Sequence, residues 1–342
     1  MIETEKKAAE SARLLDVKHL RTSFFTNDGE VKAVDDISYY INKQEVIALV
    51  GESGCGKSVS QLSVIQLIQE PPGKIIGGEI ILNGQNLLEY SPKSKEIRKI
   101  RGAKISMIFQ EPMTSLNPVY TIGSQLSEVV RVHMRVGKKE AWGRGIKALE
   151  SVGISDVDKR MKNFPFELSG GMRQRVMIAT SVACHSDLII ADEPTTALDV
   201  TTQAQVMDLL LSVVKELGTA LLVVTHNLGL VTRYAERIYV MYAGKIIESG
   251  TTEDILTCPI HPYTIGLLKS IPRLDVEQAK KLDPIAGDPP NLIDLPPRCT
   301  FLPRCQYAHE ECRLKPFPDL RCVGQSQHCV ACHLDLRSIK NG

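Results

Sequence analysis

Gly51-Glu-Ser-Gly-Cys-Gly-Lys57-Ser58 is the stretch that decides the fold, because it matches the pattern G-x-x-x-x-G-K-S between the apolar runs 45–50 and 59–68. In such a strand–loop–helix unit the glycines let backbone N–H groups curl around phosphate oxygens, and the helix start adds partial positive charge. We expect Lys57 to reach the β- and γ-phosphates of a nucleotide and Ser58 to hold Mg²⁺. The candidate phosphate contacts are Gly51, Glu52, Ser53, Gly54, Cys55, Gly56, Lys57, Ser58 and Val59.

Working outward from this loop, short apolar runs alternate with helical patterns. The runs 45–50, 104–109, 187–191 and 220–225 are apolar on both faces, which is typical of buried parallel strands. Residues 201–217 have helical apolar spacing and end before Gly218, a C-cap candidate. Residues 121–162 are mostly helical and charged, so we expect a helical insertion on an α/β core.

The run 188–191 ends in two carboxylates, Asp192 and Glu193. A carboxylate at the end of a strand beside a phosphate loop is suited to hold Mg²⁺, and we assign that role to Asp192. Glu193 would polarise the water that attacks the γ-phosphate, as a general base does.

Composition excludes several classes of protein. The chain has 342 residues, 43% apolar and 24% charged, and its net charge is +1, so it offers no overall field for a polyanion and we expect no nucleic-acid partner. Its apolar runs are too short to span a bilayer, and residues 1–10 do not resemble a signal peptide. We therefore expect an intracellular protein in a reducing compartment, where its nine cysteines would not form disulfides.

The stretch Leu168-Ser169-Gly170-Gly171-Met172-Arg173-Gln174-Arg175 resembles the signature sequence of ATP-binding cassette ATPases. Gln110, Ala197-Leu198-Asp199 and His226 also stand in the order of that family, and the likeness covers about residues 15–250. The resemblance implies an α/β P-loop NTPase cassette with a mixed-sheet core and a helical insertion at about residues 111–166.

The same resemblance implies roles for these residues. Ser169, Gly170 and Gly171 would face the γ-phosphate of ATP held by another cassette, because a helix N-terminus favours anions. His226 would contact the γ-phosphate, Gln110 would touch Mg²⁺ and water, and Asp199 would couple the two sites of a dimer. An aromatic ring is expected to stack on adenine, and Phe24 is preferred to Phe25 because it better matches the family position.

Beyond residue 250, His261-Pro262-Tyr263 and its surroundings resemble the C-terminal extension of cassette ATPases from oligopeptide, dipeptide and nickel importers. The sequence thus predicts a nucleotide-binding domain at 1–250 and a small Cys-rich C-terminal domain at 251–342. We interpret His261 as structural, with its ring hydrogen-bonded where the chain turns.

Three of the cysteines after residue 250 fall within fourteen residues and lie among arginines, which favour thiolates, so the group suits a soft metal or a cluster. Structural zinc sites usually pair ligands two to four residues apart. The surrounding sequence, about 299–332, resembles the loop of dipeptide-importer ATPases that holds a 4Fe-4S cluster, which implies Cys299, Cys305, Cys312 and Cys332 as ligands. Zinc and free buried thiols remain the alternatives, and Cys322 and Cys329 are left over.

The resemblance implies an ATPase that powers import of dipeptides or oligopeptides from the cytoplasmic face of the membrane. Its expected partners are two transmembrane permease subunits, a second cassette ATPase and, indirectly, an extracytoplasmic substrate-binding protein. A nickel importer is the alternative within the family. A soluble cassette ATPase acting on DNA or ribosomes is disfavoured, because the interval from Lys57 to Ser169 lacks sustained heptads and the charge is balanced.

Overall fold

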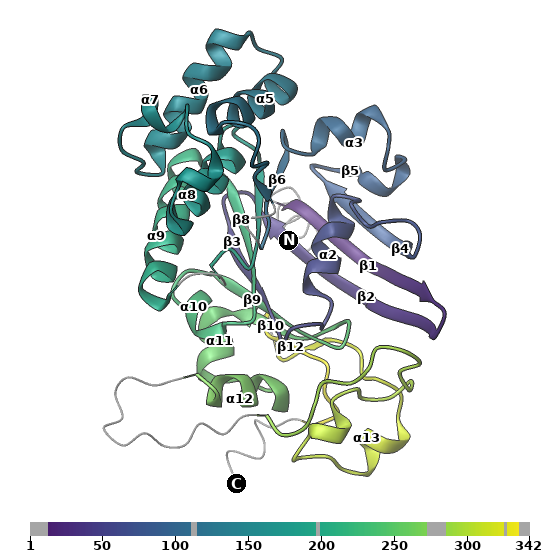
Figure 1. The fold of residues 1–342 in the computed structure, drawn as a ribbon. Coiled ribbons are helices and arrows are strands. Elements are labelled where there is room, and N and C mark those ends of the chain that lie inside the picture. Colours follow the sequence, from purple (N-terminus) through teal and green to yellow (C-terminus); the bar gives the residue numbers. More distant parts are fainter. Residues whose placement is uncertain (1–12, 111–114, 196–198, 272–284, 325–326, 335–342) are drawn as a thin grey trace, which may run out of the picture. The chain divides into compact units, whose positions relative to one another are not determined.

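The computed structural model describes residues 13–110, 115–195, 199–271, 285–324 and 327–334, which form two compact units (Figure 1). Unit 1 contains the described parts of residues 1–15, 41–46 and 87–224. Unit 2 contains those of residues 16–40, 47–86 and 225–342.

Unit 1 is built on parallel strands in the order β6-β7-β8, with Ile105 opposite Leu188 and Leu188 opposite Ala220. Every residue of β7 and β8 is buried, which confirms the interpretation of these apolar runs as core strands. The elements of this unit are η1 (Leu87–Glu89), α3 (Lys95–Ile100), β6 (Ile105–Ile108), α5 (Ile122–Met134), α6 (Lys138–Ser151), α7 (Val157–Arg160), η2 (Pro165–Glu167), α8 (Gly170–Val182), β7 (Leu188–Asp192), α9 (Val200–Leu217) and β8 (Ala220–Thr225).

The helices of unit 1 follow the sequence pattern closely. Helix α9 ends at Gly218, whose φ of +63° and N–H bonds to the carbonyls of Val214 and Lys215 form the expected C-cap. Helices α5, α6 and α7 occupy the predicted insertion, and Figure 1 shows them grouped together in teal. Helix α8 packs against α6, α9 and β6 and so connects this group to the sheet.

Unit 2 carries two sheet regions. One has the order β2-β1-β4-β5, and the other runs β11-β12-β10-β9-β3, in which β3 and β9 are parallel and the remaining pairs are antiparallel. The elements are β1 (Arg13–Thr26), β2 (Gly29–Asn42), β3 (Val46–Val50), α2 (Lys57–Val64), β4 (Gly73–Leu82), β5 (Gln85–Asn86), α10 (Leu228–Val231), β9 (Arg237–Tyr242), β10 (Lys245–Thr251), α11 (Thr252–Thr257), α12 (Pro262–Lys269), η3 (Leu302–Arg304), α13 (Glu310–Leu314), β11 (Arg321–Cys322) and β12 (Cys329–Val330).

Helix α2 is shorter than the predicted helix, which extended to residue 68. The chain leaves the helix at Ile65, and Gln66 adopts a left-handed φ of +51°, so the apolar residues that follow belong to the connection toward β4. The apolar pattern alone does not register this turn.

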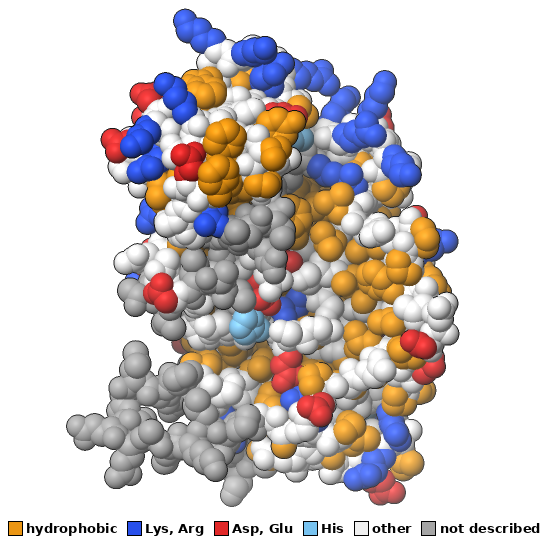
Figure 2. All heavy atoms as spheres, in the orientation of Figure 1, with side chains coloured by type: hydrophobic (Ala, Val, Ile, Leu, Met, Phe, Trp, Pro, Cys, Tyr) orange, Lys and Arg blue, Asp and Glu red, His pale blue; other side chains and the backbone are white. Residues whose placement is uncertain are grey.

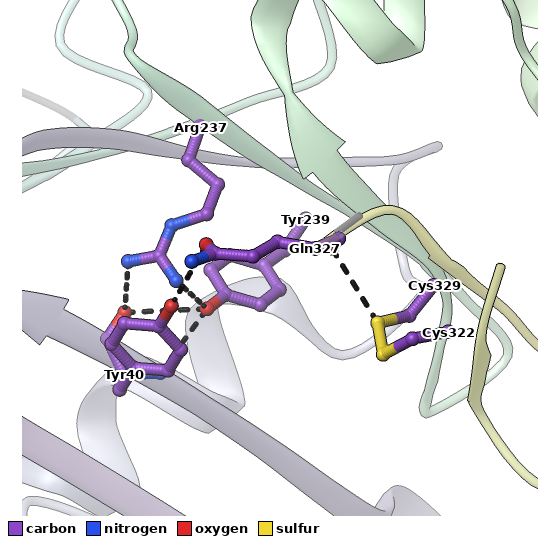
Figure 3. Close-up of a disulfide and its surroundings, with 6 residues drawn as sticks. All are labelled: Tyr40, Arg237, Tyr239, Cys322, Gln327 and Cys329. Atoms are coloured by element: carbon purple, nitrogen blue, oxygen red, sulfur yellow. Dashed lines mark hydrogen bonds between the residues drawn. A yellow bond between two sulfur atoms is a disulfide. The ribbon is translucent and has the colours of Figure 1, made fainter. Parts of the chain in front are cut away.

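The strand pair β11–β12 corrects the expectation that the cysteines form no disulfides. Cys322 and Cys329 face each other across the pair and are joined by a disulfide, because their register places the two side chains directly opposite (Figure 3). Close to this bond, the Tyr40 hydroxyl donates to Gln327 Oε1 at 3.2 Å, and the Arg237 guanidinium lies 3.7 Å from the centre of the Tyr40 ring. The C-terminal region is thereby attached to β2 and β9.

Within the described ranges, no helix combines the length and the apolar character needed to cross a bilayer.

Candidate active site

The phosphate loop lies in unit 2 and its glycines are required by the backbone. Gly56 has a φ of +103°, and a Cβ there would lie 2.0 Å from the carbonyl oxygen of Ala33. A Cβ on Gly51 would lie 2.2 Å from the carbonyl oxygen of Met241. Main-chain atoms this close leave no room for a side chain at either position. The glycines of the motif are therefore required by the packing of the loop against the neighbouring backbone.

Lys57 begins helix α2, and its side chain is turned back onto the loop. Its Nζ donates to the carbonyl oxygens of Gly51 at 2.8 Å and Glu52 at 2.9 Å, and only 4% of Lys57 is exposed. Burial raises the pKa of the neighbouring Cys55 thiol, which therefore stays neutral. Ser58 and Val59 follow Lys57 in the first turn of α2.

The remaining candidates in unit 2 are less enclosed. The Phe24 ring lies against Gly73, where an added Cβ would come 2.8 Å from its Cε1, whereas Phe25 is 52% exposed. The assignment of adenine stacking to Phe24 stays a prediction. His226 is exposed directly after β8, where the sequence placed it.

In unit 1 the acidic pair stands at the end of β7 with little solvent around it. Asp192 is 6% and Glu193 8% exposed, and Glu193 adopts a left-handed φ of +45°. Gln110, which follows β6, donates from Nε2 to Glu193 Oε2 at 3.1 Å. Because β6 and β7 are parallel neighbours, their carboxyl ends bring these two residues together.

The signature stretch forms the start of α8. Ser169 is the N-cap, and its Oγ accepts a hydrogen bond from the N–H of Met172 at 3.3 Å. Gly170 and Gly171 form the first turn, and outside the neighbouring backbone no atom of the described residues lies within 4 Å of a Cβ built on Gly170. The interpretation of this helix start as an anion site stays a prediction.

Two further contacts of unit 1 concern the signature and the end of the acidic strand. Gln174, which the sequence reasoning left without a role, is buried and donates from Nε2 to the carbonyl oxygen of Pro194. Asp199 caps α9, because Oδ1 accepts from the Thr202 N–H at 3.0 Å and Oδ2 from its hydroxyl at 2.7 Å. Ala197 and Leu198 lie outside the described residues, as do residues 111–114 at the start of the insertion.

The iron–sulfur prediction is wrong for this structure. Cys299, Cys305, Cys312 and Cys332 line one small cavity, yet the described residues contain no group of three or more His, Cys, Asp or Glu side chains placed to hold a metal ion. One of the three arginines expected to favour thiolates is also engaged elsewhere, since the Arg304 guanidinium binds Glu52.

Burial also disfavours the thiolate form of these cysteines. It raises the pKa of Cys299, Cys305 and Cys332 to about 11, so these thiols are neutral at pH 7. The absence of a metal-binding group among the described residues leaves both the 4Fe-4S cluster and its zinc alternative without support.

His261 is confirmed as structural. Its Nδ1 accepts a hydrogen bond from the Tyr263 N–H at 3.1 Å and thereby caps α12. The main-chain N–H groups of Ile260 and His261 donate to the fully buried Glu248, which also contacts His328 Nε2 at 2.7 Å.

Comparison with known proteins agrees with this geometry. Residues 34–196 match the family model for ABC transporters, and residues 247–312 match that for the C-terminal region of oligopeptide/dipeptide transporters. The chain is 49% identical to the oligopeptide transport ATP-binding protein AppD of Bacillus subtilis, covering 87% of this chain and 90% of that protein. It is 45% identical to the oligopeptide transport ATP-binding protein OppD of Salmonella typhimurium, covering 96% of both.

Among solved structures, a dimeric ATP-binding cassette in a post-hydrolysis state with ADP and Pi superposes with a TM-score of 0.62 at 26% identity, covering 70% of this chain and 98% of that one. Since relatives that are 45–49% identical cover 87–96% of the chain and residues 34–196 match the family model, the chain belongs to the ABC transporter family and is one of its ATPases.

Proposed function

We propose that this ATPase powers the import of peptides through a membrane transporter. The observation that carries the proposal is the near-complete coverage by OppD, which includes the C-terminal region as well as the cassette. A cassette shared with all ABC transporters would support ATP hydrolysis alone, whereas the likeness beyond residue 250 favours the peptide branch.

In the proposed reaction, Glu193 polarises the water that attacks the γ-phosphate, and Gln110 orients its carboxylate through the 3.1 Å hydrogen bond. Lys57 contacts the β- and γ-phosphates, and His226 contacts the γ-phosphate. Ser58 and Asp192 supply hard oxygen ligands of the kind that Mg²⁺ prefers. The metal, when bound, neutralises charge on the phosphates.

A second cassette completes the reaction in this proposal. The open N-terminus of α8, with Ser169 and Gly170, faces the γ-phosphate of ATP bound to the partner cassette, and Asp199 couples the two sites. ATP therefore closes the pair and hydrolysis reopens it, which is the movement a transporter uses.

The permease subunits are proposed to dock on the helical insertion at the cytoplasmic face of the membrane. Large apolar side chains are exposed there, and Figure 2 shows hydrophobic atoms gathered over these helices. Val119 is 70%, Val132 64% and Phe166 69% exposed, and the Phe166 ring stacks on Phe164 at 5.5 Å. Such a surface fits a short apolar helix of a membrane subunit.

The test is uptake of a labelled dipeptide, a labelled longer peptide and nickel in cells that carry the wild type or Glu193→Gln. We expect loss of peptide uptake alone, since the variant retains ATP but lacks its general base. Glu216→Gln, an exposed glutamate at the end of α9, is the matched control and should transport normally.

Loss of nickel uptake alone would show that the transported substrate is nickel, as in the nickel importers of the same family. Unchanged uptake of all three, with ATP hydrolysis abolished in the purified protein, would show that the ATPase serves a different process.

A further inference from the structure

One residue of the phosphate loop, Glu52, is bound by a side chain that lies 252 positions further along the chain. Arg304 Nη1 donates to Glu52 Oε2 at 2.6 Å, and Nη2 donates to Oε1 at 2.9 Å. This is a paired, fork-like ion pair, and all of it lies within unit 2.

The main chain of Glu52 is held as well. Its N–H donates to the Tyr263 hydroxyl at 2.8 Å, and its carbonyl oxygen accepts from Lys57 Nζ at 2.9 Å. Glu52 therefore connects Arg304 and Tyr263, both in the C-terminal region, with the lysine that binds phosphate.

The two C-terminal side chains are themselves held by further contacts within the protein. The Arg304 side chain is 5% exposed, and its Nε donates to the carbonyl oxygen of Ala286 at 3.1 Å. The Tyr263 ring packs against Tyr242 at 4.7 Å and against Phe301 at 5.5 Å, measured between ring centres. The hydrogen bond to Glu52 also raises the pKa of Arg304, so this guanidinium stays charged.

The charge of Glu52 gives this arrangement a consequence for ATP. A carboxylate on a phosphate loop repels the negative charge of the triphosphate unless a cation neutralises it. Arg304 both neutralises Glu52 and turns its carboxylate toward the C-terminal region.

We propose that Arg304 and Tyr263 are positioning residues for ATP, which act through Glu52 to hold the phosphate loop and Lys57 in their binding geometry. The Cys-rich loop that contains Arg304 thus contributes to the nucleotide site without a metal. The inference rests on ATP binding, which the family establishes, and it is independent of the cargo.

The test is the affinity of the purified full chain for ATP, measured by calorimetric titration at low and at high salt. Arg304→Gln should raise the Kd about tenfold at low salt and less at high salt, because an unpaired Glu52 carboxylate then repels the triphosphate. Glu52→Gln/Arg304→Gln should recover most of the affinity. Arg298→Gln removes an exposed arginine from the same region and should change nothing.

Two variants guard against a simple folding defect. Arg304→Lys keeps the charge but not the fork, and we expect it to fold and to bind ATP within about threefold of the wild type. Tyr263→Phe removes only the acceptor of the Glu52 N–H and should raise the Kd about twofold.

An unchanged Kd in Arg304→Gln would overturn the proposal. So would an equal, salt-independent loss in Arg304→Gln and in the double variant, since that pattern would mean that the pair only supports local packing.

Discussion

The phosphate loop (51–58) and the Cys-rich loop (about 299–332) are two segments whose residue spacing suggested a bound group, but the spacing has a different physical basis in each. In the phosphate loop the glycine spacing follows from the backbone geometry, since a Cβ at Gly51 or Gly56 would clash with main-chain atoms. In the Cys-rich loop the cysteine spacing does not correspond to a metal-binding group among the described residues, and one of its arginines, Arg304, pairs with a residue far away in the sequence. The residue spacing of a motif predicts a site reliably when contacts with the main chain require those residues, as they do at Gly51 and Gly56.

The largest expected effect separates two glycines inside the phosphate loop. Gly56→Ala should destabilise the fold by at least about 4 kcal/mol and abolish ATP binding, because its Cβ would lie 2.0 Å from the oxygen of Ala33. Gly54 also has a positive φ, +79°, but apart from its chain neighbours no atom of the described residues lies within 4 Å of a Cβ built there, so Gly54→Ala should lose only about 1 kcal/mol.

Urea unfolding of both variants, together with ATP titration, measures this difference. Equal losses at the two positions would mean that the loop depends on flexibility and not on close approach.

The next effect concerns the anchor of the C-terminal region. Glu248 is fully buried and accepts hydrogen bonds from the N–H groups of Ile260 and His261. Glu248→Ala should destabilise the protein by about 3–5 kcal/mol, because it leaves buried donors without an acceptor. The exposed Glu253 gives the control, since Glu253→Ala should change the urea midpoint little. A small loss in both variants would show that the extension is held mainly by its apolar contacts.

Most of the cassette could be predicted from sequence because its signals are local. The buried strands and the C-cap at Gly218 follow from runs of a few residues. The hydrogen bond from Gln110 to Glu193 joins residues 83 positions apart and was not predicted. The predicted extent of α2 was wrong because an apolar pattern does not register the left-handed turn at Gln66.

The family of the extension was predicted correctly, but its side-chain contacts were not, because they join residues that are distant in the sequence. Glu52 and Arg304 are 252 positions apart, and no local sequence pattern near either residue predicts that they form an ion pair. The cysteine prediction was wrong in part for the same reason, since one of the three arginines expected to favour thiolates is bound to Glu52, and burial raises the pKa of the Cys299 thiol.

The buried His261 makes the stability of the C-terminal region depend on pH, which a pH series can test. Burial lowers its pKa from 6.5 to about 4, so the folded protein keeps this ring neutral while the unfolded chain protonates it. The unfolded state therefore binds more protons between pH 6.5 and 4, and stability falls as the pH is lowered through that window. The contribution is about 3 kcal/mol when the window is crossed completely.

His261→Asn retains a side chain that can cap α12 but removes the titration. Urea unfolding at several pH values should show the advantage of the wild type shrinking toward pH 4. A constant difference between the two proteins across this range would contradict a neutral, buried His261.

The smallest effect tests whether the end of the extension is held by its disulfide. Cross-linking Cys322 to Cys329 closes a short loop, so its loss should destabilise the protein by only about 2 kcal/mol. The hairpin also keeps its pairing of Glu248 with Val330 and the hydrogen bond from Tyr40 to Gln327, which limit the loss further. Cys322→Ser/Cys329→Ser should therefore match the wild type under reducing agent and be insensitive to it. If reductant lowers the urea midpoint of that variant as well, other cysteines of the chain form a disulfide. The stabilising cross-link would then lie elsewhere than between β11 and β12.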